Sequence, residues 1–265
     1  MKEQYKIDLR LIPADELIPH EETVPHLYDK LSRRMLHDNV QRDPIIVDES
    51  SRVVLDGMHR LGALKRMGAK LVVCSSVNYM SDEVKLFRWF RFVENPRVGL
   101  VSTVLSALGA MEESPFPGNA QAITTAGIVY KGRIHSIPRV SRVEEVSELT
   151  RRFDRLMRDA GAPLEFFDES SASPELLGGN YLALVTPRFG KEDVIRSGVE
   201  RRLLPPKTTL HVLPVRPMGI NYPIESLRNG DDVLDRILLS RPRRIIEPPS
   251  FYRGRLYREP VVVLE

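Results

Sequence analysis

The chain has 265 residues, of which 42% are hydrophobic and 28% are charged, and its formal net charge at pH 7 is +3. These values exclude a largely disordered chain and are typical of a globular protein with one large or two modest domains. The longest nearly uncharged apolar run, residues 98–111, is too short to span a bilayer, so we expect no membrane partner. The first six residues lack the apolar core of a secretion signal, which predicts a cytoplasmic protein.

The N-terminal part of the chain shows the element order of a small mixed α/β unit. Residues 7–12 have the pattern of a strand, and apolar residues at helical spacing predict an amphipathic helix over residues 25–36. The elements expected next are a strand opened by Pro44, a strand at 53–55, a helix at 61–67 and a strand at 71–77.

Further helices and a domain boundary are predicted beyond residue 80. Ser81 precedes a predicted helix with Val84, Phe87 and Phe90 on one face. Residues 98–111 are expected to form a buried helix, and the proline- and glycine-rich stretch at 113–119 a linker. We therefore expect domains at 1–113 and 119–265. The second should contain strands at 122–130, 181–186 and 261–264, and helices at 143–160 and from residue 191 to near 198.

The strand-to-helix turn at residues 56–60 is the most informative motif. Gly57 can take a positive φ at little cost, and His59 and Arg60 place donors at the start of the following helix. Helix N-terminal amides and a guanidinium together favour anionic oxygens such as phosphate. The same residues would equally suit a turn without a ligand, capped by Asp56, and the pattern alone leaves both interpretations open.

Three separated segments together resemble one known superfamily. These are the Pro-His-Glu segment at 19–21 with the Pro44 strand and the Asp-Gly-x-His-Arg turn, a Pro-Pro-Lys-Thr-Thr-x-His-x-x-Pro block at 205–214, and Trp89. This arrangement resembles the ParB/sulfiredoxin superfamily, and within it the free L-serine kinases. The resemblance covers residues 7–93 well and 180–222 moderately.

The resemblance implies an α/β (α+β) fold, with a ParB/sulfiredoxin-like nucleotide-binding domain at 1–113 and a substrate-binding mixed α/β domain at 119–265. It implies a kinase that transfers a phosphoryl group from ATP or ADP to the hydroxyl of free L-serine, with Mg²⁺ as a further cofactor. The residues implied to bind the nucleotide are Asp56, Gly57, Met58, His59 and Arg60.

Two carboxylates have implied catalytic roles. Glu21 matches the glutamate thought to act as general base, which would accept the proton of the serine hydroxyl, and Glu22 is the alternative. Asp56 would hold Mg²⁺ or orient the acceptor. Without the resemblance, Glu21 and Glu22 would be interpreted as exposed loop charges.

A second group of residues would bind the charged groups of the L-serine acceptor. Lys207, Thr208, Thr209 and His211 place a cation, two hydroxyls and an imidazole within five residues, and Trp89 could close the pocket. The structural alternative is a proline-capped strand whose threonines reflect β propensity, with Trp89 in the core.

Other enzyme classes fail on particular residues. The spacing from Gly62 to Gly68 does not fit a P-loop, and Pro25 interrupts the His-Glu segment where a zinc protease needs a helix. Sulfiredoxins have their catalytic cysteine where this chain has Met58, and Cys74, the single cysteine, lies in an apolar run.

The remaining alternative is a ParB-like regulator that binds nucleotide or DNA without turnover. The arginine-rich segment at 241–258 has the pattern of a solvated face, so nucleic acid is a minor expectation as a partner. Met58 and Leu210 depart from the archaeal kinase pattern, which has His and Arg there. The sequence does not choose between ATP and ADP and does not indicate an oligomeric state.

Overall fold

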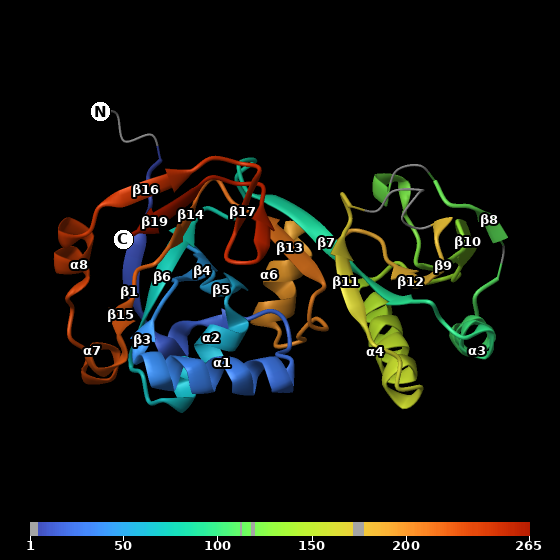
Figure 1. Cartoon of the computed structure of the whole chain (residues 1–265), viewed down its shortest axis with the longest axis horizontal. Helices are drawn as coiled ribbons and strands as arrows, with labels where there is room; N and C mark the ends of the chain where they lie inside the picture. Colours follow the sequence, from blue (N-terminus) through green and yellow to red (C-terminus); the bar gives the residue numbers. More distant parts are fainter. Residues whose placement is uncertain (1–4, 112, 118–119, 172–177) are drawn as a thin grey trace. The chain divides into compact units, whose positions relative to one another are not determined.

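The structure is a computed structural model that describes residues 5–111, 113–117, 120–171 and 178–265 (Figure 1). The fold is mixed α/β, as predicted, and the chain divides into two compact units. The first unit consists of Met1–Leu86, Val194–Pro206 and His211–Glu265, and the second of Phe87–Asp193 with Lys207–Leu210. Strand β7, helix α6 and strand β13 each cross from one unit to the other.

The first unit is built on a five-stranded sheet with the strand order β1-β6-β4-β5-β2. Its elements before residue 86 are β1 (Leu9–Pro13), η1 (Ala14–Glu16), β2 (Ile18–Pro19), α1 (Pro25–Asp38), β3 (Val40–Gln41), β4 (Ile45–Asp48), β5 (Val53–Asp56), α2 (Met58–Arg66) and β6 (Leu71–Val77). Helix α2 begins three residues earlier than predicted, so His59 and Arg60 lie in its first turn.

The C-terminal part of the chain completes the first unit. Its elements are β14 (Arg216–Met218), β15 (Tyr222–Pro223), α7 (Ile224–Asn229), α8 (Leu234–Ser240), β16 (Arg243–Ile246), β17 (Ser250–Tyr252), β18 (Arg255–Tyr257) and β19 (Val261–Leu264). Strands β14, β19 and β16 form a three-stranded sheet, and β15 pairs with β3.

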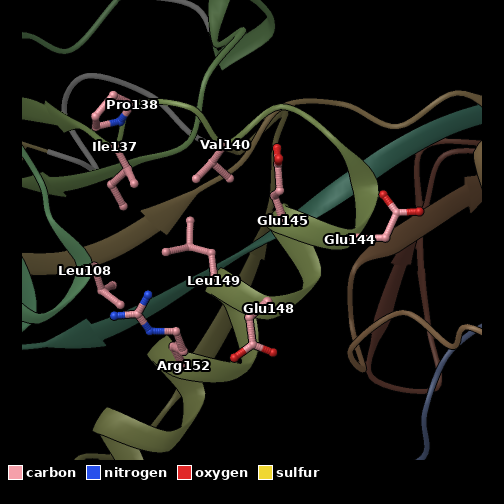
Figure 2. Close-up of a pocket in the computed structure, with 9 residues that line it drawn as sticks. All are labelled: Leu108, Ile137, Pro138, Val140, Glu144, Glu145, Glu148, Leu149 and Arg152. Atoms are coloured by element: carbon pink, nitrogen blue, oxygen red, sulfur yellow. The ribbon is translucent and has the colours of Figure 1, made fainter.

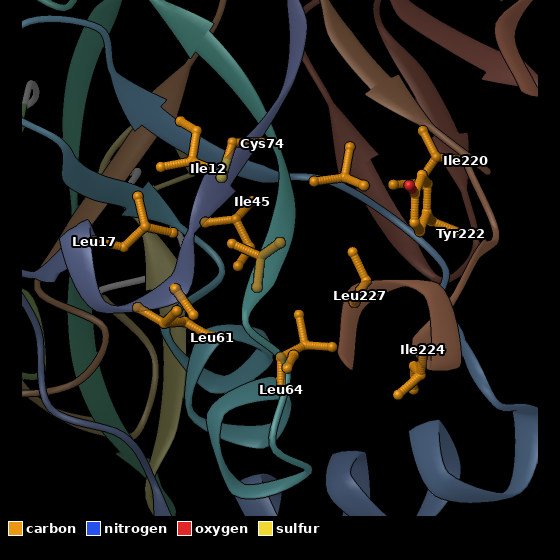
Figure 3. Close-up of a cluster of buried hydrophobic side chains, with 14 of the residues drawn as sticks. Ile12, Leu17, Ile45, Leu61, Leu64, Cys74, Ile220, Tyr222, Ile224 and Leu227 are labelled. Atoms are coloured by element: carbon orange, nitrogen blue, oxygen red, sulfur yellow. The ribbon is translucent and has the colours of Figure 1, made fainter. Parts of the chain in front are cut away.

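The hydrophobic core explains why distant parts of the chain form one unit. Ile220, Tyr222 and Leu227 from the C-terminal part are fully buried in the same cluster as Ile45 and Leu64 (Figure 3). Because each buried side chain of this size contributes roughly 1.5–3 kcal/mol, the N-terminal segment without residues 220–227 would expose a large part of its core.

The domain division therefore differs from the two contiguous domains expected from the sequence. The predicted linker at 113–119 falls inside the second unit, where residues 113–115 form strand β8; residues 112, 118 and 119 lie outside the described residues. The sequence pattern of that stretch could not show that the chain returns to its N-terminal core.

The second unit contains the sheet with the order β11-β7-β12-β9-β10-β8, in which β13 also pairs with β7. Its elements, with those that cross between units, are β7 (Lys85–Glu94), α3 (Val98–Leu108), β8 (Glu113–Pro115), η2 (Ala120–Ala122), β9 (Gly127–Tyr130), β10 (Arg133–Ser136), α4 (Val143–Asp159), β11 (Glu165–Asp168), β12 (Tyr181–Val185), α6 (Lys191–Val199) and β13 (Thr209–Val212). The strand predicted from residue 122 begins only at Gly127.

One predicted helix is a strand. From Lys85 onward, the residues expected to form a helix after Ser81, including Trp89, lie on β7, which pairs with both β11 and β12. The apolar positions 84, 87 and 90 fit a helical spacing by coincidence, whereas the aromatic and branched residues of β7 favour a pleated surface. Among the described residues, no helix combines the length and the apolar character needed to cross a membrane.

Candidate functional site

The turn between β5 and α2 has the backbone geometry predicted for residues 56–60. Asp56 ends β5, and Gly57 occupies the N-cap position of α2 with φ +109°. Its carbonyl oxygen accepts a hydrogen bond from the Leu61 N–H at 2.9 Å. The first amides of this nine-residue helix, which have no partners within the helix, therefore lie next to Asp56. The N-terminus of a helix favours negative charge.

Glycine at position 57 suits the positive φ and also leaves room for the side chain of Arg60. A Cβ atom on Gly57 would lie 2.9 Å from Nη2 of Arg60, closer than real Cβ contacts allow. The same Nη2 atom lies 3.6 Å from Oδ1 of Asp56. The guanidinium of Arg60 thus folds back over the turn, and a side chain at position 57 would make it shift.

Asp56 is surrounded by three guanidinium groups. Its Oδ2 accepts a hydrogen bond from Nη1 of Arg216 at 2.5 Å and lies 3.9 Å from Nη1 of Arg255, while Arg60 approaches Oδ1. Burial alone would raise the pKa of Asp56, but Arg60, Arg216 and Arg255 together hold it far below its usual range. Asp56 is therefore ionised at any physiological pH.

Arg216 connects several parts of the site. Its Nε atom donates to Oε1 of Glu259 at 2.6 Å, and its Nη2 donates to the carbonyl oxygen of His211 at 3.2 Å. Arg216 and Glu259 are both 4% exposed, so this ion pair is fully buried. Burial would lower the pKa of Arg216, but Asp56 and Glu259 outweigh it and raise the pKa, so its charge is permanent.

The segment containing Glu21 is fixed to the first unit by its backbone. The Leu204 N–H donates to the His20 carbonyl at 2.8 Å, and the Glu22 N–H donates to the Leu204 carbonyl at 2.9 Å. The ring of His20 donates from Nδ1 to the Val54 carbonyl at 2.5 Å, which leaves Nε2 3.7 Å from Oε1 of Glu21. Glu21 is only 6% exposed, so the alternative that it is an exposed loop charge is wrong.

His211, on β13, has its described contacts in this part of the first unit. Its Nε2 is hydrogen-bonded to the Tyr79 hydroxyl at 2.9 Å, and its ring meets that of His20 edge-on with centroids 5.6 Å apart. Burial, with the neighbouring His20, lowers the pKa of His211 to about 3. The imidazole is therefore neutral and supplies no positive charge for an anionic group.

His59 is oriented by the backbone that follows Glu22. The Val24 N–H donates to Nε2 of His59 at 2.9 Å, so this nitrogen is an acceptor and the proton of the neutral ring is on Nδ1. His59 therefore joins the 20–24 segment to the first turn of α2. Met58, the first residue of α2, packs on the main core of the first unit.

Trp89, Lys207, Thr208 and Thr209 come together in the second unit. The Nζ atom of Lys207 lies 4.9 Å from the centre of the Trp89 ring, and the Trp89 N–H donates to the Thr208 carbonyl at 3.3 Å. Lys207 has φ +56°, a conformation that non-glycine residues adopt at a cost and that is concentrated at functional sites. Thr209 is 9% exposed. The predicted block thus spans the boundary of the two units, with Lys207–Leu210 in the second unit and His211 in the first.

The surroundings of Asp56 do not fit a magnesium ion held by protein ligands. One oxygen already accepts a short hydrogen bond from Arg216, and three guanidiniums give the site a positive field. Among the described residues, no group of three or more His, Cys, Asp or Glu side chains is arranged to hold a metal. Mg²⁺ is commonly bound through substrate phosphates with few protein ligands, and such binding does not require Asp56 as a ligand.

A separate pocket lies in the second unit (Figure 2). It has an apolar wall that includes Leu108, Ile137 and Leu149, and an acidic side formed by Glu144, Glu145 and Glu148 from α4. None of the predicted site residues lines this pocket. Cys74, the other residue weighed for chemistry, is fully buried, and burial raises the pKa of its thiol to about 12, so it is not a reactive thiolate.

Sequence reasoning missed Arg216, Glu259 and Arg255. Arg216 follows the predicted 205–214 block directly, which was the one available signal. Arg255 belongs to the arginine-rich segment at 241–258, whose pattern is that of a solvated face, and Glu259 follows that segment directly. A buried ion pair between positions 43 residues apart leaves no periodic pattern, so the sequence alone could not identify it.

Comparisons with known proteins agree with the resemblance to the free L-serine kinases, because the chain is similar over most of its length to proteins that carry this name. The chain is 27% identical over 233 residues to an ATP-dependent L-serine kinase of Staphylothermus marinus, covering 82% of this chain and 90% of that protein. It is 23% identical over 229 residues to an ADP-dependent L-serine kinase of Thermococcus kodakarensis, covering 84% of this chain and 94% of that protein.

A solved structure shares the fold. A free serine kinase in complex with AMP superposes with a TM-score of 0.67 at 21% identity, covering 84% of this chain and 95% of that chain. No protein-family model matches the sequence.

Proposed function

We propose that this protein is a nucleotide-dependent kinase that phosphorylates free L-serine to O-phospho-L-serine. The observation that carries the proposal is similarity to L-serine kinases that spans 82% of this chain and 90% of one such relative. A match of that extent involves the whole architecture and not a single shared turn. In this proposal the protein acts in the cytoplasm.

The nucleotide's phosphates bind at the turn formed by residues 56–60. The positive φ of Gly57, the amides at the start of α2 and the folded-back guanidinium of Arg60 support this role. Asp56 organises the arginines around the turn. Mg²⁺ accompanies the nucleotide as a counter-ion of its phosphates.

Glu21 acts as the general base. Its burial and its position beside His20 support the role, because a general base must be held in place within hydrogen-bond reach of the proton that it accepts. The serine hydroxyl loses its proton to Glu21 as its oxygen bonds to the terminal phosphorus. The bond from that phosphorus to the bridging oxygen breaks, and the shortened nucleotide leaves with the electron pair.

The amino acid's carboxylate is bound by Lys207 with Thr208 and Thr209, and Trp89 covers the substrate. The close approach of Nζ of Lys207 to the Trp89 ring and the left-handed backbone at Lys207 support this assignment. His211 supports the site through its contacts with Tyr79 and His20 and does not bind the carboxylate as a cation.

The test is formation of O-phosphoserine from L-serine, with Mg²⁺ and either ATP or ADP in parallel. We expect product with at least one nucleotide, and the productive one is the donor. Glu21→Gln should lower kcat by roughly 10²–10⁴-fold while nucleotide binding is retained. Glu22→Gln is the matched control and should stay near wild type. Folded wild-type protein that makes no product with either nucleotide would overturn the proposal.

A further inference from the structure

The hairpin formed by β17 and β18 presents an arginine at the Asp56 turn. The strands pair antiparallel, with Tyr252 opposite Arg255, and the two residues between them have φ +48° at Arg253 and +80° at Gly254. Two successive positive φ values are typical of the tight two-residue turns that match strand twist. The turn therefore fixes where Arg255 begins β18.

The two faces of the hairpin differ in character. Phe251 and Leu256 lie opposite each other and are 75% and 51% exposed, whereas Tyr257 is 5% exposed. Because side chains alternate between the faces of a strand, Arg255 shares the face of Tyr257, which packs on the first unit. The guanidinium of Arg255 lies over the Tyr257 ring, 5.1 Å from its centre.

Arg255 is held much more loosely at Asp56 than Arg216 is. Its Nη1 lies 3.9 Å from Oδ2 of Asp56, beyond hydrogen-bond distance, and its side chain is 39% exposed. Arg216 donates to the same oxygen at 2.5 Å and has a side chain that is 5% exposed. Arg216 is thus a fixed part of the site, and Arg255 can exchange its partner at little cost.

The charges around the turn are not balanced. Three guanidiniums, those of Arg60, Arg216 and Arg255, face the carboxylates of Asp56 and Glu259. Within this group of five described side chains, one positive charge is left over beside the N-terminus of α2. The Nε atom of Arg60 is also buried without a hydrogen-bond acceptor among the described residues. An anionic ligand would supply the missing negative charge and the missing acceptor.

A second arginine anchors the hairpin. Nη1 of Arg253 lies 3.2 Å from Oδ1 of Asp43, and that oxygen also accepts the Gly219 N–H at 2.9 Å. Arg253 therefore ties the hairpin's turn to a fixed point of the first unit. This anchor keeps Arg255 near the Asp56 turn.

We propose that Arg255, carried by the β17–β18 hairpin, binds a phosphate group of the nucleotide together with Arg60. This inference rests on the proposed function, which places the phosphates at the Asp56 turn. The phosphate replaces Asp56 as the partner of Arg255, and Arg216 keeps Asp56 in place. The C-terminal hairpin is then part of the nucleotide site, and Arg253 is a positioning residue that acts through it.

The experiment is calorimetric titration of the full chain with AMP, ADP and ATP. Arg255→Gln should weaken the binding of at least one of the three by about tenfold or more, because a guanidinium forms strong charge-assisted hydrogen bonds to phosphate. Arg255→Lys keeps the charge without the planar fork and should recover part of the loss. Arg253→Gln should give a smaller loss. Arg33→Gln, an exposed charge change on α1, is the matched control and should bind as wild type does.

The two proposals fail in different ways. Wild type that binds nucleotide, with Arg255→Gln binding all three equally well, would overturn the role of Arg255 and leave the proposed function standing. Wild type that binds none of the three would overturn the proposed function, and this inference with it. The unfolding midpoint of each variant shows whether a loss of binding reflects a loss of fold.

Discussion

Nη1 of Arg216 lies 2.5 Å from Oδ2 of Asp56, although the two residues are 160 positions apart in the chain. This contact joins the end of β5 to β14 and brings the C-terminal part of the first unit to the turn that starts α2. Because Arg216 also pairs with Glu259, one guanidinium bridges two carboxylates. The site and the core of the first unit therefore both depend on the packing of the C-terminal part of the chain against the N-terminal part.

Arg216→Met should destabilise the first unit strongly. Removing one partner of a buried ion pair leaves a carboxylate without compensation, which typically costs about 3–5 kcal/mol. The measurement is urea unfolding followed by circular dichroism. Arg244→Met, which breaks the exposed pair with Glu265, is the control and should cost no more than about 1 kcal/mol. Equal losses in the two variants would contradict a structural role for the buried pair.

Asp56 should make folding stability depend on pH in the acid range. Its pKa is lower in the folded protein than the ordinary value of 3.8, so its contribution is complete above that value and is lost as pH falls toward the folded pKa. Wild type should be more stable than Asp56→Asn at pH 7, and the difference in unfolding free energy should shrink below pH 5. A difference that stays constant from pH 7 to pH 3 would contradict the lowered pKa.

The sequence predicted the local features of this site and not its long-range ones. The Gly57 turn and the strands at 45–48, 53–56 and 71–77 follow from nearest-neighbour patterns, since glycine, proline and alternating apolar residues act locally. Arg216, Arg255 and Glu259 were missed because their roles depend on tertiary pairing. The strand at Trp89 was mistaken for a helix because three apolar positions satisfied a helical spacing over a short stretch.

Gly57 and Gly68 form a matched pair for testing the turn. Both have positive φ, +109° and +77°, so alanine should cost each about 1 kcal/mol of stability from backbone strain. Only at Gly57 does the new Cβ meet another side chain, that of Arg60, which must move. Gly57→Ala should therefore weaken nucleotide binding about tenfold, and Gly68→Ala should leave it unchanged. Equal affinities in the two variants would show that the position of Arg60 over the turn does not matter for binding.

Trp89 is the single tryptophan of the chain, so its fluorescence reports directly on the proposed substrate site. Nζ of Lys207 lies 4.9 Å from its ring centre, and an amino-acid carboxylate that draws Lys207 away would change the field at the indole. L-serine should therefore change the Trp89 emission in a saturable way. Lys207→Met should abolish this response and raise KM for serine at least tenfold, with a smaller effect on kcat, because binding of the carboxylate is shared by ground state and transition state.

Lys131→Met, which removes the ammonium near Tyr130 in the same unit, is the control and should titrate as wild type does. An unchanged serine titration in Lys207→Met would show that the Trp89–Lys207 pair does not bind the substrate.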